Sequence, residues 1–311
     1  MGTETVAERS LERSTFRGWP SLRMRQHGLC LHVVPSVGGR LMGISWHGNE
    51  LAFVHDALAG QTPAPDSAER WQAQCVGWHF PLWGGGKTWI APQSEWPGAE
   101  PHRDLDSGDW SVDAHWCNDV EMGVRVTSPV CRQAGLQIQR TLVMMADSTA
   151  WRIEQVLINR GKEPRRAGLW DVQMLCRPGS VTAVLQAAAG CLSATEGQPS
   201  LSALQDLGHL SLSDAGMQLR CENSFEFKCG FSADQGTMVA VVPVPGGSVR
   251  YTRRSACLAG ASWAHGHQLE VFNAPVLPYF EIESHSPLKT IGPGECLKWE
   301  IHERIGLGTS P

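Results

Sequence analysis

The stretch Gly84-Gly85-Gly86-Lys87-Thr88 ends like a nucleotide-binding phosphate loop, whose chemistry is phosphate binding by backbone amides and a lysine. That pattern, G-x-x-x-x-G-K-[ST], requires a glycine at position 81, and this chain has Pro81 there. A phosphate loop also leads into a helix, whereas Pro92 blocks a continuing helix here. The sequence therefore favours a glycine-rich turn, either plain or facing a ligand, over a nucleotide site.

The side chains around this turn suit the recognition of a sugar. Indole faces pack against the C–H side of a pyranose, so we predict Trp83 and Trp89 as substrate-binding residues. We predict the same role for Lys87 and Glu95, which offer charged groups to hydroxyls. Lys87 would also meet a carboxylate or phosphate on a modified sugar. The competing interpretation is a solvated loop, which polar residues between glycine and proline usually form.

A second set of candidates lies in the stretch Glu281-Ile282-Glu283-Ser284-His285. In a strand, Glu281 and Glu283 point to the same face, opposite Ile282. Glu283 is the best candidate in the chain for a general base, and we predict His285 as a substrate-binding residue. The competing interpretation is a surface carboxylate at the end of a strand.

The histidines and cysteines give only weak indications of a metal. His265-Gly266-His267 is a possible pair of ligands, but the sequence shows no carboxylate close to it. The ten cysteines are scattered and form no C-x-x-C motif, which favours free thiols in a reducing cytoplasm. We therefore expect no metal and no cofactor.

Composition narrows the function classes. A net charge of −5 without a long basic run argues against nucleic acid, and no apolar stretch approaches the length of a membrane span. The N-terminus lacks the apolar region of a secretory signal, so we expect a cytoplasmic protein. Of the 13 tryptophans, seven lie between positions 71 and 116, where some belong to a core and others suit a ring-stacking platform.

Short strands punctuated by turns run through most of the chain. With 33 glycines, 19 prolines and no sustained helical periodicity, the sequence predicts an all-β fold, a large antiparallel β-sandwich. We expect one domain over residues 25–305, between a polar tail at 1–24 and a short tail at 306–311. The predicted strands are 29–34, 40–46, 50–54, 109–116, 121–127, 136–144, 151–159, 167–175, 181–186, 207–212, 217–221, 225–229, 238–244, 248–252, 269–273, 280–284 and 296–304.

Specific stretches within this pattern resemble the galactose mutarotase-like superfamily. The stretch 33–44, VVPSVGGRLMGI, is similar to its opening hairpin, and 156–159, VLIN, to its central strand and Asn. The stretch 278–288, PYFEIESHSPL, followed by 292–295, GPGE, is similar to its ending. The resemblance covers about residues 25–305 and indicates a branch separate from the standard aldose 1-epimerases.

This resemblance implies a supersandwich with a sugar bound in an open cleft, and a reaction that interconverts anomers. In that reaction a carboxylate, matched by Glu283, removes the proton of the anomeric hydroxyl, and a histidine protonates the ring oxygen. The stretch 168–174, which corresponds to the family's histidine segment, contains no histidine. His79, His102 or a buried Asp171 would have to substitute, and we predict His79 as catalytic and Asp171 as substrate-binding.

Three functions stay open. The first is an aldose 1-epimerase-like isomerase, and the second is a sugar-binding protein that has lost catalysis. A third, a cupin-like metal enzyme, needs a tighter cluster of histidines and glutamates than the sequence shows. We expect a small-molecule carbohydrate as the partner and a monomer or homodimer as the assembly.

Overall fold

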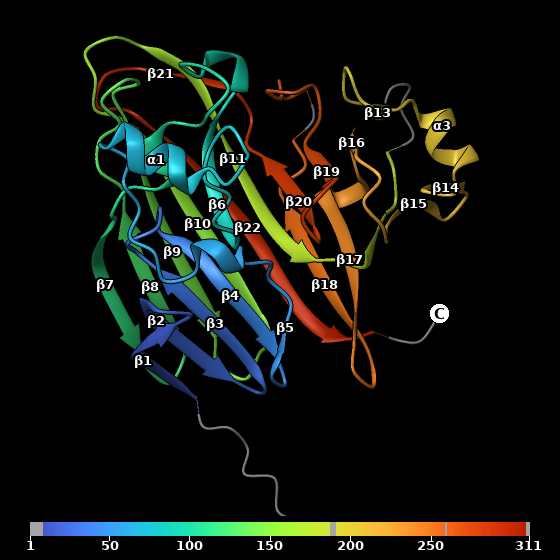
Figure 1. Ribbon diagram of the computed structural model, residues 1–311, viewed down its shortest axis with the longest axis horizontal. Coiled ribbons are helices and arrows are strands. Elements are labelled where there is room, and N and C mark those ends of the chain that lie inside the picture. The colour runs from blue at the N-terminus through green and yellow to red at the C-terminus, as the bar shows by residue number, and fades with distance from the viewer. Residues whose placement is uncertain (1–8, 187–190, 259, 309–311) are drawn as a thin grey trace, which may run out of the picture.

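The structure, a computed structural model, describes residues 9–186, 191–258 and 260–308. Two large sheets dominate these residues, and the strand pairings within each sheet are antiparallel (Figure 1). The all-β sandwich predicted from the sequence is confirmed. No helix in the described part of the chain is long and apolar enough to cross a membrane.

The first sheet has twelve strands. They are β1 (Ser10–Phe16), β2 (Trp19–Gln26), β3 (Leu29–Val34), β4 (Arg40–Trp46), β5 (Asn49–Glu50), β6 (Gly86–Ala91), β11 (Arg165–Cys176), β13 (Leu192–Ala194), β16 (Phe227–Phe231), β19 (Leu269–Asn273), β20 (Tyr279–His285) and β21 (Lys289–Ile291). Ten of them follow in the order β1-β2-β3-β4-β6-β11-β20-β19-β16-β13, while β5 pairs with β4 and β21 with β11. Strands far apart in the sequence thus meet at the centre of this sheet.

The second sheet has ten strands, in the order β14-β15-β12-β17-β18-β22-β10-β9-β8-β7. Their bounds are β7 (Ser111–Cys117), β8 (Glu121–Thr127), β9 (Leu136–Met145), β10 (Ala150–Asn159), β12 (Gly179–Ala183), β14 (Leu210–Ser213), β15 (Gly216–Cys221), β17 (Thr237–Val244), β18 (Gly247–Ser255) and β22 (Cys296–Leu307). The helices are short: α1 (Ala68–Gln74), α2 (Arg103–Asp106), α3 (Leu201–Asp206) and the 3-10 turns Asp56–Leu58, Gln93–Glu95 and Asp234–Gly236.

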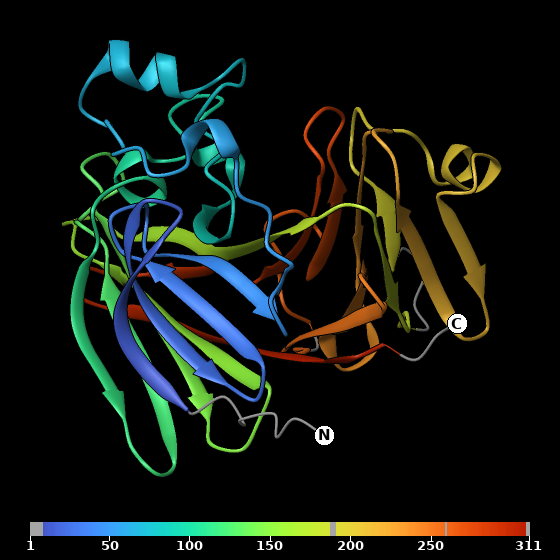
Figure 2. The same ribbon diagram turned by 60° about the horizontal axis from the view of Figure 1, so that its bottom comes forward.

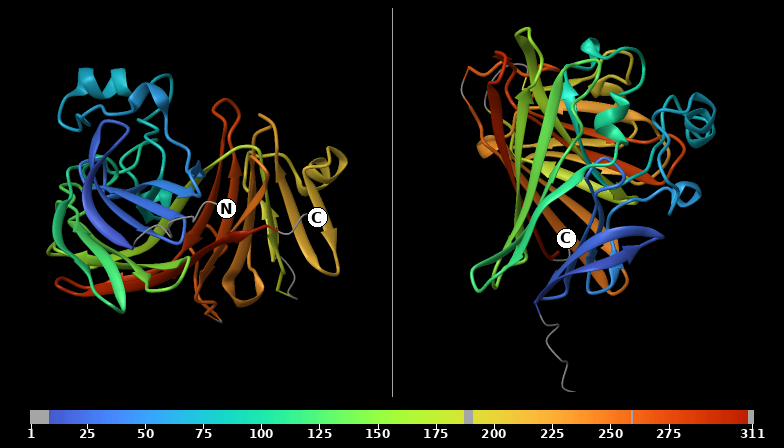
Figure 3. Two further views of the ribbon diagram at one scale, coloured as in Figure 1. Left: turned by 90° about the horizontal axis from the view of Figure 1, so that it is seen from below. Right: turned by 90° about the vertical axis from the view of Figure 1, so that its left-hand side faces the viewer.

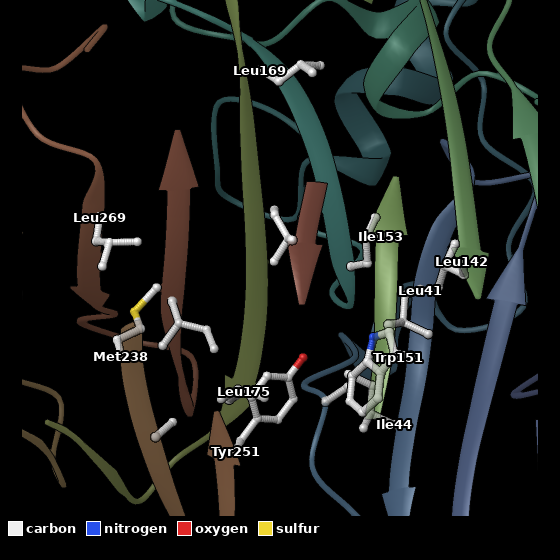
Figure 4. Packing of buried hydrophobic residues seen from close by; sticks show 14 of the residues in the cluster. Leu41, Ile44, Leu142, Trp151, Ile153, Leu169, Leu175, Met238, Tyr251 and Leu269 are labelled. Atoms are coloured by element: carbon white, nitrogen blue, oxygen red, sulfur yellow. The ribbon is translucent and has the colours of Figure 1, made fainter. Parts of the chain in front are cut away.

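The main core lies between the two sheets. Figure 4 shows Leu169, Leu175 and Leu269 of the first sheet together with Trp151 and Tyr251 of the second. Side chains alternate along a strand, so the residues before and after each core residue of the first sheet point to its opposite, outer face. The segment that carries α1 lies on this outer side, away from the second sheet (Figures 2 and 3).

The prediction of a polar tail over residues 1–24 is wrong for the part of it that the structure describes, because strands begin at Ser10. β1 and β2 form a hairpin that adds to β3, and Trp19, Leu22 and Met24 are buried. Arginine and serine fill the alternate positions of these strands, so the apolar periodicity is diluted and the sequence looks like a polar tail. The C-terminal tail is also shorter than expected, because β22 continues to Leu307.

The glycine-rich stretch is a turn that leads into a strand. Gly84 and Gly85 have φ values of 101° and 66°, a region that favours glycine. A Cβ on Gly84 would lie 2.3 Å from the carbonyl oxygen of Phe53. From Gly86 the chain continues as β6, and this excludes the helix that a phosphate loop requires.

Glu50, at the end of β5, makes the stability of this fold depend on pH. Burial raises the pKa of its carboxyl from 4.5 to about 7, although its Oε1 accepts a hydrogen bond from the Ile44 amide at 2.9 Å. The folded state therefore holds a proton that the unfolded chain releases, and stability falls as pH rises from 4.5 through 7. Glu50→Gln is expected to unfold with the wild-type free energy near pH 4.5.

Well above pH 7 the same variant is expected to be more stable than the wild type by about 3 kcal/mol, from the rise of the Glu50 pKa from 4.5 to about 7. Urea unfolding of both proteins at the two ends of this pH range measures the difference. A free-energy difference between them that does not change with pH contradicts the proposed burial of the Glu50 proton.

Candidate functional site

A cluster of charged side chains occupies the outer face of the first sheet. It spans β6, β11, β20, β19 and β16, which are consecutive neighbours in the sheet. The alternation explains its position: Phe280 and Ile282 are in the main core, so Glu281 and Glu283 face outward. Its members, called the charged cluster below, are Lys87, Lys228, His265, Glu270, Glu281, Glu283 and His285.

Register brings the carboxylates of this cluster together. Glu270 on β19 pairs directly with Glu283 on β20. Leu269 and Val271, on either side of Glu270, belong to the main core, so its side chain is on the same outer face as Glu283. Lys228 on β16 bridges the two, with its Nζ 3.0 Å from an oxygen of each carboxylate.

Glu283 is fully buried and only half engaged by its neighbours. Its Oε2 accepts hydrogen bonds from Trp170 Nε1 at 2.6 Å and from Lys228 Nζ at 3.0 Å. Its Oε1 is buried and has no partner among the described residues. Burial raises the pKa of Glu283 to about 8, with Glu270 and Glu281 adding to the rise and Lys228 opposing it. The free oxygen is therefore a stronger proton acceptor than that of an ordinary glutamate.

Glu270 has the opposite electrostatics. Burial alone would raise its pKa, but Lys228 and His285 hold the pKa of this carboxyl well below its usual range. His285 Nε2 lies 3.1 Å and His265 Nδ1 3.2 Å from Glu270 Oε2. Two adjacent carboxyls thus differ in protonation, with Glu270 ionised and Glu283 inclined to keep its proton.

A second ion pair lies beside this group. Lys87 Nζ is 3.0 Å from Glu281 Oε1 and 4.2 Å from the centre of the Trp89 ring. Both side chains of the pair are almost completely enclosed. Burial lowers the pKa of Lys87, and Glu281 counteracts this. The pair closes the end of the charged cluster nearest to β6.

Aromatic rings form the wall around these groups. Trp89 and Trp170 meet edge to face with centroids 5.0 Å apart, while Trp96 stacks on Trp170 at 5.7 Å. On its other side Trp170 stacks with His285 at 5.5 Å. The rings contact one another and are nearly fully buried, so solvent reaches the charged cluster mainly at Lys228 and His265, whose side chains are 16% and 19% exposed.

Four of the predicted site residues meet in this arrangement: Lys87, Trp89, Glu283 and His285. Sequence reasoning missed Lys228, His265 and Glu270 and did not single out Trp170. A signal was present, because Lys228 and Glu270 each interrupt an apolar strand at a position that alternates with core residues.

Two predicted substrate-binding residues are corrected by the structure. Trp83 is completely buried in a separate core, where it packs against Trp19 and donates a hydrogen bond to Ser107 Oγ. Asp171 faces the interior between the sheets, opposite to Trp170, and is bound by Arg140 and Arg253. Because β11 is buried on both faces, its sequence does not reveal which side chains face the cluster.

The other two predicted residues lie outside the cluster. Glu95 is exposed in a 3-10 turn beside a hollow of about 390 Å³ that His102 also borders. His79 is exposed in the loop before β6 and makes no hydrogen bond or ion pair with another described residue. Their roles at a ligand remain predictions.

One subset of the cluster has the composition of a metal-ligand set. Ligand atoms of His265, Glu270 and His285 all lie within 4.8 Å of one another. The neighbour expected from the sequence, His267, points elsewhere, and its Nε2 lies 2.6 Å from Ser193 Oγ. Glu270 on β19 thus provides the carboxylate near His265 that was not recognised from the sequence.

No family model matches the chain, and no curated protein matches it in sequence. Solved structures do match. A galactose mutarotase-like protein from Clostridium acetobutylicum is 12% identical, with a TM-score of 0.57 over 96% of this chain and 99% of that one. A galactose mutarotase-like protein from Lactobacillus casei is 8% identical, with a TM-score of 0.55 over 92% of this chain and 100% of that one.

A candidate aldose 1-epimerase from Klebsiella pneumoniae is 13% identical, with a TM-score of 0.62 over 92% of this chain and 79% of that one. At these identities the likeness establishes the architecture. The chain has the galactose mutarotase-like fold, in agreement with the resemblance of its sequence stretches.

Proposed function

We propose that the protein is a carbohydrate-active isomerase that acts at the anomeric centre of an aldose. The observation that carries this proposal is Glu283, a buried carboxyl whose Oε1 is free and whose Oε2 is fixed by Trp170 and Lys228. In its ionised form, which predominates above a pH of about 8, a carboxyl positioned in this way can accept a proton from a hydroxyl placed beside it. The fold, which a candidate aldose 1-epimerase shares, supports a sugar as the ligand.

The proposed reaction is an acid–base ring opening. Glu283 takes the proton of the anomeric hydroxyl, the electrons of that O–H bond form the carbonyl, and the bond between the anomeric carbon and the ring oxygen breaks. The ring oxygen receives a proton from an acid, for which His79 stays our candidate. The carbonyl group then rotates, and the ring closes on its other face as both protons return.

Lys228 has a distinct part in this proposal. Its ammonium lies 3.0 Å from Glu283 and stabilises the charged form of that carboxylate. Phe80, next to His79 in the chain, packs edge to face against Trp89 with centroids 5.8 Å apart. The loop that carries the proposed acid therefore packs against the aromatic wall of the charged cluster.

The second candidate is a sugar-binding protein without catalysis. Two observations favour it: β11 carries no histidine, and the side chain of Glu283 is fully enclosed. An enclosed base has to become accessible before a sugar hydroxyl reaches it. This candidate predicts affinity for a sugar and no effect on anomer exchange.

Anomer exchange measured by NMR separates the two candidates. We expect the wild-type protein to increase the exchange rate between the α and β anomers of one member of a panel of aldoses, including a uronic acid and a sugar phosphate. Binding of a sugar without faster exchange would establish the second candidate. Absence of both across the panel would contradict a carbohydrate function of either kind.

A further inference from the structure

The charged cluster contains a compact set of three side chains that no step of the proposed ring opening uses. His265 Nδ1 lies 3.2 Å and His285 Nε2 lies 3.1 Å from the same carboxylate oxygen, Oε2 of Glu270. We propose that His265, Glu270 and His285 form a binding site for one divalent transition-metal ion of the zinc type. This proposal does not rest on the proposed function.

The spacing of the three groups fits such an ion. Imidazole nitrogens and carboxylate oxygens bind Zn²⁺ at about 2.0–2.1 Å, and tetrahedral geometry then separates ligand atoms by about 3.3 Å. The measured separations from Glu270 Oε2 are 3.1 and 3.2 Å, and all three ligand atoms fall within 4.8 Å. Only small side-chain movements are needed to place an ion between them.

The donor types select the class of metal. Two imidazoles with one carboxylate suit zinc and similar first-row ions, whereas magnesium and calcium prefer sites built from oxygen alone. Three protein ligands leave one coordination position for water or for an oxygen of a bound molecule. The set is therefore of the open kind that is found in catalytic and ligand-binding metal sites.

The surrounding charges do not oppose a cation. The cluster holds three carboxyl groups, Glu270, Glu281 and Glu283, against two ammonium groups, Lys87 and Lys228. With Glu283 protonated and both histidines neutral, the carboxylates of Glu270 and Glu281 balance the two ammonium groups, and ionisation of Glu283 adds one negative charge. Glu270 and His285 are almost completely enclosed, at 2% and 0% exposure, so a bound ion would be poorly screened by solvent.

Lys228 is the competitor of the proposed ion, since its Nζ lies 3.0 Å from Glu270 Oε2. The same ammonium lies 3.0 Å from Glu283, so it keeps a carboxylate partner when Glu270 turns to a metal. Substitution of Lys228 and substitution of a ligand are therefore expected to change the affinity for the metal in opposite directions. Removing the positive charge of Lys228 should strengthen metal binding, whereas loss of any ligand should weaken it.

The experiment uses the full-length protein after treatment with a chelator. Zn²⁺ binding is measured by isothermal titration calorimetry, and Co²⁺ is then used as a spectroscopic probe of its visible ligand-field bands. Because Cys117, Cys257 and Cys296 are exposed, the Co²⁺ spectra must also be inspected for thiolate charge-transfer bands. We expect one site per chain, with ligand-field bands and without those of thiolate.

Four variants test the assignment. His265→Ala changes a partly exposed side chain, and Glu270→Gln keeps the shape of its side chain, so both are suited to retain the fold. Each is expected to weaken Zn²⁺ binding by more than about 100-fold, because even outer-shell partners of a metal contribute 10–100-fold. His267→Ala, the matched control two residues from His265, is expected to bind like the wild type.

The fourth variant, Lys228→Gln, is expected to bind Zn²⁺ more tightly than the wild type. Thermal unfolding of each variant without metal shows that it is folded before binding is compared. Failure of the wild type to bind Zn²⁺, or equal binding by His265→Ala, Glu270→Gln and the wild type, would overturn the site. Since the measurements are of binding, they remain informative whether or not the protein exchanges anomers.

Discussion

Glu283→Gln is expected to lower the rate of anomer exchange by about 10²–10⁴-fold, the range that a positioned general base contributes. Glutamine has nearly the same shape, and its carbonyl oxygen can still accept the hydrogen bond from Trp170 Nε1 that Glu283 Oε2 accepts now. Lys228 keeps Glu270 as its partner at 3.0 Å. The variant therefore removes the proton acceptor and leaves the wall of the site in place. NMR exchange spectroscopy on the sugar that the wild type turns over measures the effect.

Glu50→Gln is the matched control for this experiment. Like Glu283, Glu50 is a largely enclosed carboxyl whose pKa is raised by burial, but it lies on β5 and outside the charged cluster. Its exchange rate is expected to equal that of the wild type. If Glu283→Gln retained the wild-type rate while staying folded, Glu283 would not be the base, and the isomerase proposal would lose its main support.

The architecture could be predicted from local patterns because strands of this protein carry strong signals. The ranges expected for β3, β4, β8 and β19 agree with the structure at both ends. Glycine and proline mark the turns between most strands, and the apolar side chains of the core recur with period two. The N-terminal hairpin was not predicted, because polar residues outnumber the apolar Trp19, Leu22 and Met24 in its strands and hide their periodicity.

The site was only partly predictable, for a different reason. Alternation within one strand places Glu281 and Glu283 on the same face, and the sequence is enough for that inference. The neighbours of Glu283 come from strand order, which the sequence did not specify. Lys228 is 55 residues and Trp170 is 113 residues away in the chain, and both contact Glu283 only because β16, β19, β20 and β11 are adjacent.

Asp171, predicted as a substrate-binding residue, has its side chain on the face of β11 opposite to the charged cluster. It lies on β11 between Trp170, which faces the cluster, and Val172, and all three are buried. A strand with one wet face would have shown Asp171 as the exposed polar residue. In β11, Asp171 instead faces the core, where it forms ion pairs with Arg140 and Arg253 of the second sheet.

Those partners form a buried network that supports the site from behind. Asp171 is bound by Arg253 and by Arg140, whose Nη2 lies 3.2 Å from its Oδ2, and it accepts a hydrogen bond from Thr88 Oγ1 at 2.9 Å. Arg253 Nη1 also donates to the carbonyl oxygen of Ile282 at 2.6 Å. Ile282 separates Glu281 from Glu283, so this network holds the backbone of β20 where it carries both carboxylates.

Asp171→Asn is expected to lower the free energy of unfolding by about 3–5 kcal/mol, the cost of breaking a buried ion pair. The substitution removes one negative charge and leaves Arg253 with Glu303, whose Oε1 lies 3.0 Å from Arg253 Nε, while Arg140 loses its only carboxylate partner in the described chain. Urea unfolding at neutral pH measures the change. Because β20 loses its support, anomer exchange should also slow, although Asp171 itself never faces the cluster.

Glu154→Gln is the control for this effect, because Glu154 forms an ion pair with Arg152 at the surface and its side chain is 39% exposed. Exposed ion pairs contribute little, so its unfolding curve should stay close to that of the wild type. Equal stability of Asp171→Asn and Glu154→Gln would mean that solvent reaches the interior network. In that case the rigidity of β20, and the fixed position of Glu283 with it, would need another source than the charges behind the sheet.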